Sequence, residues 1–202
     1  MVDAKKAKTV DKWKTKIWYS VLAPDFFDSK EIGQIISSDE SNLKNRVIKI
    51  GLGELTGTFS PNTAYTNLFF RVKEVVGRTA KTAFIGHELM PGYVRTLARR
   101  RRSVINQVDD VVTKDGVPMR IKMLCITGLK VSESVRTDVR KALSAAIKSI
   151  ASATDFPVLS QELAYGKLSS KLFNAVKKIG PIKRVEVRKS EVKESFHKEG
   201  QA

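Results

Sequence analysis

Hydrophobic and polar residues alternate along much of the first two thirds of the chain, which is the pattern of strands with one buried face. Within residues 66–77, for example, Leu68, Phe70 and Val72 fall on one face. The same alternation predicts strands over residues 12–24, 45–57, 66–77, 78–89, 104–113 and 117–127, and the strand at 45–57 is expected to end in a Gly-rich turn.

Turn residues and short helical patterns separate these strands. Gly77 and the dipeptide Asp115–Gly116 predict tight turns, so the strands on either side of each are expected to pair as antiparallel hairpins. Residues 25–33 predict a short helix stopped by Gly33, and residues 92–102 predict a helix inserted between two strands.

The period of the pattern changes after residue 132. Val139, Leu143 and Ile147 recur every four residues, as on the buried face of a helix. A second helical pattern covers residues 168–176 and stops at Gly180. Residues 181–189 then predict a final strand, before a mostly polar end.

Together these elements predict an α+β fold, mainly an antiparallel β-barrel decorated with α-helices and followed by a helical C-terminal part. The predicted organisation is a mobile basic arm at 1–11, a β-barrel domain at 12–132 with an inserted Arg-rich helix, a helical part with a final strand at 133–189, and a flexible tail at 190–202.

Charge is distributed unevenly along this framework. The 202 residues carry 37 Lys and Arg against 21 Asp and Glu, a net charge of +16. Residues 71–150 alone hold 17 basic and 7 acidic residues. A concentration of this size indicates a polyanionic partner, either nucleic acid or an anionic membrane surface.

The densest basic stretch is "GYVRTLARRRRSVI", residues 92–105. In a helix, Arg95, Arg99 and Arg102 would lie on one stripe, and no acidic residue stands between Glu88 and Asp109. A run of charges is ordinarily a solvated face balanced by acids nearby. Here the acids are missing, and guanidinium groups grip phosphate oxygens bidentately, so the run predicts contact with a nucleic-acid backbone.

Further basic residues are expected on strands and at a turn. In the N-terminal strand, lysines alternate with Trp13 and Ile17. Trp13 and Trp18 should point to opposite faces, so one of them is expected in the core. Stacking of an RNA base on either tryptophan is an alternative. Lys114 falls at the tip of a hairpin. The residues expected to contact RNA are Lys12, Lys14, Lys16, Arg95, Arg99, Arg100, Arg101, Arg102, Lys114, Arg120 and Lys122.

Catalysis finds little support in the sequence. In "GLGELTG" (51–57) the third glycine is one position late for a dinucleotide-binding loop. His87 and His197 stand far apart, and Cys125 sits in an apolar strand where a buried thiol is expected. We therefore expect no catalytic residue, no metal site, no cofactor and no small-molecule substrate. The sequence has neither an apolar run long enough to span a membrane nor a secretory signal, so a cytoplasmic protein is expected.

Six segments in a fixed order carry a family resemblance. They are "WYSVLAPDFF", "NRVIKIGLGELTG", "FRVKEVVGRTAKTAFIGHEL", "YVRTLARRRRSVI", "TKDGVPMRIK" and "VRKALSAAI". Over roughly residues 10–190, this set resembles the archaeal–eukaryotic small-subunit ribosomal protein family S-three-Ae, also called e-S-one, with a length closer to the archaeal members. One departure is Asn45, where the family usually has a glycine.

The resemblance implies a non-enzymatic constituent of the small ribosomal subunit with a β-barrel decorated by helices. It implies a place on the platform, near the messenger exit and the 3′ end of the small-subunit RNA. The implied partners are small-subunit rRNA, neighbouring platform proteins and messenger RNA near the exit. It supplies no binding residues, so the RNA contacts above rest on charge and position.

Three other classes stay open from the residues alone. A free RNA-binding translation regulator or RNA chaperone would use the same basic surface. An enzyme acting on RNA would need a convergent acid or metal site. A membrane binder would need a strongly amphipathic basic helix, and residues 134–152 fit that pattern weakly because their apolar face is rich in alanine.

Overall fold

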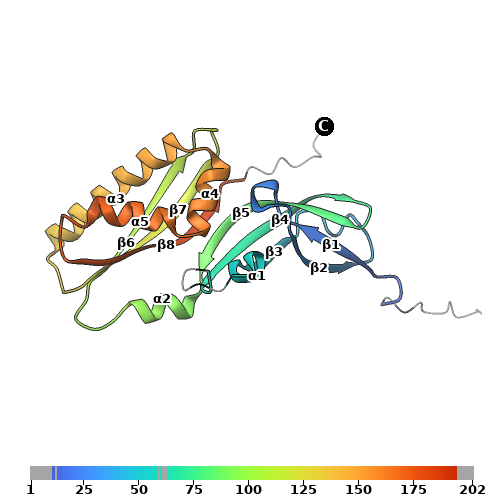
Figure 1. Ribbon diagram of the computed structural model, residues 1–202, viewed down its shortest axis with the longest axis horizontal. Helices are drawn as coiled ribbons and strands as arrows, with labels where there is room; N and C mark the ends of the chain where they lie inside the picture. The colour runs from blue at the N-terminus through green and yellow to red at the C-terminus, as the bar shows by residue number, and fades with distance from the viewer. Residues whose placement is uncertain (1–10, 12, 59, 61–62, 195–202) are drawn as a thin grey trace, which may run out of the picture.

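The computed structural model describes residues 11, 13–58, 60 and 63–194 (Figure 1). Its first half consists of β1 (Ile17–Leu22), the 3₁₀ turn η1 (Asp25–Phe27), β2 (Glu31–Ser37), β3 (Val47–Gly51), α1 (Leu52–Thr56), β4 (Thr66–Val76) and β5 (Thr79–Leu89). Its second half consists of α2 (Pro91–Leu97), β6 (Val104–Val112), β7 (Pro118–Thr127), α3 (Glu133–Ala153), α4 (Phe156–Ala164), α5 (Lys167–Val176) and β8 (Ile182–Val192).

Five strands curl together in the first half. β4 and β5 form a long antiparallel hairpin, β3 pairs with β4, and β1 pairs with β5 in parallel and with β2 in antiparallel orientation. Gly77 turns the hairpin with a φ of 60°, as its position in the sequence predicts. The buried face of this sheet holds Phe27, Leu68 and Phe70 with the fully buried Leu52 from α1.

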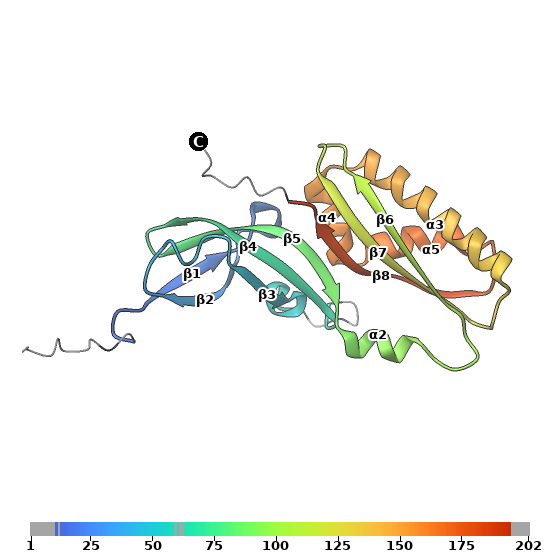
Figure 2. The same ribbon diagram turned by 180° about the vertical axis from the view of Figure 1, so that it is seen from behind.

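The second half is a layer of helices on a three-stranded antiparallel sheet. β6, β7 and β8 lie side by side, and α3, α4 and α5 cover one face of them (Figures 1 and 2). The helical spacing of Val139, Leu143 and Ile147 places all three in the core beneath α3. The opposite face of this sheet, on β6 and β7, carries exposed valines and charged side chains.

β5 joins the two halves. Its first part pairs with β1, while Gly86–Glu88 pair with Lys189–Glu191 of β8. A side chain at Gly86 would place its Cβ 2.1 Å from the Ser190 carbonyl oxygen, so the two backbones can approach only because the residue is glycine. Next to it the buried His87 ring binds Ser190, with Nδ1 2.6 Å from its Oγ.

The sheet of the predicted β-barrel is not closed in the structure. The strand order is β2-β1-β5-β8-β7-β6, with β3 and β4 branching from β5, and within the described residues β2, β3 and β6 end the sheet as unpaired edges. The fold is therefore a mixed α/β arrangement with an open eight-stranded sheet. The five strands of the first half run in the order β3-β4-β5-β1-β2, and a closed barrel would require β2 to pair with β3, which it does not do among the described residues.

Several predicted boundaries also change. The N-terminal strand begins only at Ile17, because Asp11 accepts hydrogen bonds from the Trp13 and Lys14 backbone and bends the chain into a turn. Trp13 and Trp18 are 66% and 59% exposed, so neither enters the core. The helix predicted at 25–33 is a single turn, Asp25–Phe27. Additional elements are β2, the short helix α1 in place of a Gly-rich turn, α4, and the end of β8, which extends three residues into the predicted tail.

Asn45 keeps a left-handed turn although it is not a glycine. Its φ is 65°, and its backbone N–H donates to the Val72 carbonyl at 2.9 Å. Asparagine tolerates this conformation better than other residues with a Cβ. The turn before β3 is therefore preserved at this position.

Candidate nucleic-acid interface

The arginine run forms a loop, which corrects the predicted helix over residues 92–102. Helix α2 ends at Leu97, and Arg99–Arg102 lead into β6 through a turn in which Arg101 has a φ of 62°. None of the residues of α2 is buried, so no packing energy extends the helix. Continuing it would also place Arg99 one turn above Arg95, and like charges at that spacing are destabilising. We call Ala98–Arg102 the arginine loop.

The segment that carries the arginine loop is anchored at the start of α2 and directly after the loop. At the start of α2, the Met90 N–H donates to the Tyr65 carbonyl at 2.8 Å, and the Tyr93 ring stacks on Tyr65. At the other end, the buried Ser103 exchanges hydrogen bonds with Thr127: its N–H donates to Thr127 Oγ1 at 2.9 Å, and its carbonyl accepts from the Thr127 N–H at 3.0 Å. The loop thus presents its side chains from fixed supports.

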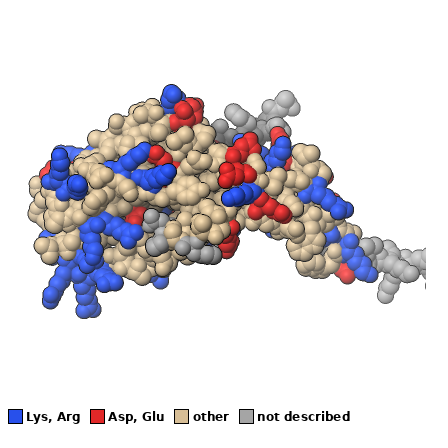
Figure 3. Space-filling model, in the orientation of Figure 1, with Lys and Arg blue, Asp and Glu red and all other residues tan. Residues whose placement is uncertain are grey.

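Arg95 and the four arginines of the loop present their guanidinium groups at the surface. Arg95, Arg99, Arg100 and Arg101 are exposed and Arg102 is half-buried. Among the described residues, none of these five forms an ion pair. Figure 3 shows Lys and Arg side chains projecting from the body over the segment between α2 and β6, with little acidic surface beside them.

Helix α3 brings Arg136 against Ser103, the residue that follows the arginine loop. Arg136 donates from Nη2 to Ser103 Oγ at 3.2 Å. Arg136 and Arg140 also share one carboxylate, that of Glu133, at 2.9 and 3.0 Å. Hydrogen bonds from these arginines, Arg140 first, lower the pKa of Glu133. The two arginines thus share one carboxylate, while Asp138 supplies a second acidic group in the same part of α3.

The three predicted residues on or next to β7 are paired with carboxylates. Arg120 donates from Nε and Nη2 to both oxygens of Asp110, at 2.8 and 3.0 Å. This fork, together with Lys193, holds the pKa of Asp110 well below its usual range. Lys122 lies 3.5 Å from Glu191, and Lys114 at the hairpin tip lies 3.5 Å from Asp155. Each of these cations is at least partly neutralised within the chain.

The N-terminal lysines lie far from the arginine loop. Lys14 and Lys16 are exposed, and the Lys16 ammonium sits 3.9 Å above the centre of the Trp13 ring. Lys12 lies outside the described residues. Figures 1 and 2 place the start of β1 and the loop after α2 at opposite ends of the long axis. The structure therefore does not bring the two predicted basic sites together.

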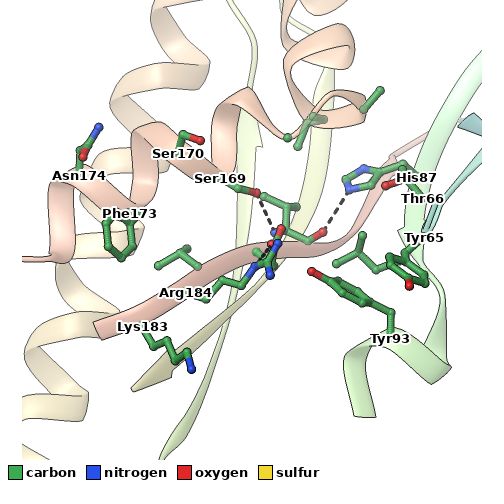
Figure 4. Close-up of a pocket in the computed structure, with 17 residues that line it drawn as sticks. Tyr65, Thr66, His87, Tyr93, Ser169, Ser170, Phe173, Asn174, Lys183 and Arg184 are labelled. Atoms are coloured by element: carbon green, nitrogen blue, oxygen red, sulfur yellow. Dashed lines mark hydrogen bonds and ion pairs between the residues drawn. The ribbon is translucent and has the colours of Figure 1, made fainter. Parts of the chain in front are cut away.

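A cleft that the sequence pattern does not indicate lies beside α2. It has a volume of about 290 Å³ and opens between α5, β8 and the start of β4 (Figure 4). Tyr65 and Tyr93 form one wall, with ring centres 4.5 Å apart and planes 6° from parallel. Arg184 of β8 lies against Tyr93, and Phe173 of α5 stands on the other side. We call it the tyrosine cleft.

The floor of the tyrosine cleft includes His87. Its Nε2 lies 3.2 Å from the Val187 carbonyl, which can only accept, so Nε2 carries the proton and Nδ1 accepts from the Ser190 hydroxyl. Burial lowers the pKa of His87 to about 4. The ring is therefore neutral and structural. In the sequence His87 is a single histidine within a predicted strand, and nothing near it indicates that it contacts Val187 and Ser190.

The described residues contain no cluster of His, Cys, Asp or Glu that could hold a metal ion. Cys125 is fully buried, and burial raises the pKa of its thiol to about 11. No described helix is long and apolar enough to cross a membrane. The features of the described residues that could bind a ligand are exposed arginine side chains and stacked tyrosine rings.

Comparison with known proteins identifies the family of the chain. A model of the Ribosomal S3Ae family matches residues 4–195. The "Small ribosomal subunit protein eS1" of Saccharolobus islandicus (strain L.S.2.15) is 38% identical over 191 residues, covering 95% of this chain and 91% of that protein. The protein of the same name from Sulfurisphaera tokodaii is 38% identical over 182 residues, covering 90% of this chain and 93% of that protein. The one from Saccharolobus solfataricus is 37% identical over 191 residues, covering 95% of this chain and 91% of that protein.

The family match spans nearly the whole chain, and these relatives, all archaeal, are similar along most of their own length. The chain belongs to the Ribosomal S3Ae family, and it is a structural protein of the small ribosomal subunit rather than an enzyme.

Proposed function

We propose that this protein binds folded small-subunit rRNA on the platform, near the messenger exit and the rRNA 3′ end, with the arginine loop as its principal contact. The supporting observation is a set of exposed guanidinium groups that have no acidic partner among the described residues, carried on a segment anchored at the start of α2 and at Ser103. Fixed, planar, forked donors suit phosphate oxygens in a set geometry. Such contacts read the shape of the RNA more than its sequence.

The carboxylate-paired residues have a weaker role in this proposal. Arg120, Lys122 and Lys114 must leave Asp110, Glu191 and Asp155 before they can neutralise a phosphate. Lys14 and Lys16 are free to bind from the far end of the molecule, and we assign them contacts with a separate RNA segment. Neighbouring platform proteins and messenger RNA at the exit are further proposed partners, in the cytoplasm.

The alternative is a free RNA-binding regulator or chaperone that uses the same loop away from the ribosome. Sedimentation separates the two functions. Our proposal predicts that the chain co-migrates with small subunits at moderate salt, and that a variant with Arg99, Arg100 and Arg101 changed to Gln stays largely in the soluble fraction. A wild-type chain that never co-migrates, or a variant that assembles normally, contradicts it.

Crosslinking locates the contact within the particle. Ultraviolet crosslinks from assembled subunits should join the segment at 95–102 to small-subunit rRNA close to its 3′ end. Crosslinks confined to the face of β6–β8 would instead assign the RNA to the carboxylate-paired residues, and that result would overturn the role of the arginine loop.

A further inference from the structure

The tyrosine cleft has a flat stacking surface. Figure 4 shows Tyr93 between Tyr65 and Arg184. The Arg184 guanidinium carbon lies 5.6 Å from the centre of the Tyr93 ring, and Tyr65 stacks on the other side. Unpaired RNA bases stack on aromatic rings and on guanidinium planes in this way. A protein that contacts only the phosphates of RNA does not need a stack of flat side chains.

The polar groups of the cleft combine a donor with an acceptor. Arg184 donates from Nε to Glu186 at 2.6 Å, and the Glu186 side chain is only 15% exposed. A half-enclosed carboxylate repels a phosphate, but it accepts hydrogen bonds from the N–H groups of a base. Guanine offers two adjacent N–H donors on one edge, which suit a carboxylate.

The position of the cleft relates it to the arginine loop. Tyr93 belongs to α2, and the arginine loop follows that helix directly. Lys183, an exposed residue of β8, lies at the rim (Figure 4). A nucleotide whose phosphate lies on the basic rim can therefore reach inward with its base.

We propose that the tyrosine cleft binds a single unpaired base of the RNA, preferring guanine, stacked on the outer face of the Arg184 guanidinium, whose inner face lies on Tyr93, and hydrogen-bonded to Glu186. This inference rests on the proposed RNA-binding function and adds one site of base recognition to it. Binding through the loop alone would tolerate any base. The cleft adds a preference at one nucleotide.

A charge-matched pair of probes isolates the base. The first is a fluorescent hexameric sugar–phosphate chain with one guanine at its third position, and the second is the same chain without a base. Fluorescence anisotropy with the full-length protein should give about tenfold tighter binding of the guanine probe, from the usual strength of one stacked base. Equal affinities for the two probes would overturn the proposal.

Variants separate stacking from charge. Tyr93→Leu should abolish the guanine advantage, while Tyr93→Phe, which keeps the ring, should retain most of it. Arg184→Lys keeps the charge but loses the planar fork, so it should reduce the guanine advantage; this variant also covers the case in which Tyr93→Leu fails to fold. A guanine advantage that survives both Tyr93→Leu and Arg184→Lys would contradict the site.

The arginine loop is tested on the base-free probe in the same assay. If changing Arg99, Arg100 and Arg101 to Gln leaves that binding intact, the proposed function fails whatever the cleft does. If it weakens binding while wild type shows no guanine advantage, only the cleft proposal fails. Replacing guanine by uracil should lower the affinity of the wild type, and an unchanged affinity would contradict the role of Glu186.

Discussion

Replacing Gly86 by alanine should disrupt the junction between the two halves of the protein. The new Cβ would lie 2.1 Å from the Ser190 carbonyl oxygen, 3.0 Å from its carbonyl carbon and 3.3 Å from the Glu191 Cα. All three atoms belong to the backbone of β8, so no side chain can rotate away. The strand must move by more than about 1 Å, because ordinary contacts of this kind are near 3.5 Å.

The cost follows from what that movement breaks. Overpacking alone typically costs about 1–3 kcal/mol. Displacing β8 also weakens the pairing of Gly86–Glu88 with Lys189–Glu191 and the buried hydrogen bonds between His87 and Ser190. With about 1 kcal/mol for each hydrogen bond lost, the total is about 3–5 kcal/mol. For a chain of this size that lowers the melting temperature by about 10 °C or more.

Thermal unfolding followed by circular dichroism measures this shift, and Gly92→Ala is the matched control. No atom lies within 4 Å of a Cβ added at Gly92, which lies in α2, where alanine favours the helix. The control should melt at or slightly above the wild-type temperature. A Gly86→Ala variant that melts within about 2 °C of wild type would refute the close approach of β5 and β8.

Three further predictions concern single residues. His87 is held neutral with a pKa of about 4, so the unfolded chain takes up its proton first, and stability should fall as pH drops from 6.5 towards 4. The free energy of unfolding should fall by about 2 kcal/mol at pH 5. Urea unfolding measures this loss, which should be absent in His87→Gln. The buried Cys125, with its pKa raised to about 11, should react with a thiol reagent only at the rate of unfolding, and fast labelling of native protein would contradict its burial. Asp110→Asn should release Arg120 and Lys193 and steepen the salt dependence of RNA binding, and an unchanged slope would show that these cations do not reach RNA.

The sequence predicted well those elements that have a strong period and local partners. The long hairpin through Gly77, the hairpin through Asp115–Gly116 and helix α3 all lie where their patterns placed them, because a turn residue or a helical stripe acts over a few residues. Helix propensity was misleading at the arginine run. Arg, Leu and Ala favour helix, but α2 has no buried residue to sustain it past Leu97.

Features that depend on distant pairings could not be predicted. The branched sheet depends on Gly86 meeting Ser190, more than a hundred positions later. The tyrosine cleft joins Tyr65 and Tyr93 with Arg184 from the last strand. Whether a predicted basic residue is free or neutralised also follows from register, since Arg120 lies opposite Asp110 on the neighbouring strand. Charge counts along the chain contain none of this information.

The most direct test of the arginine loop is the salt dependence of binding to small-subunit rRNA. Two variants each lose three positive charges. The loop variant changes the exposed Arg99, Arg100 and Arg101 to Gln. The control variant changes Lys44, Lys73 and Lys81 to Gln; these lysines are also exposed and form no ion pair among the described residues. In a plot of log affinity against log salt, the loop variant should lose about two units of slope and the lysine control less than one. Equal slopes for the two variants would mean that net charge, not the loop, holds the RNA.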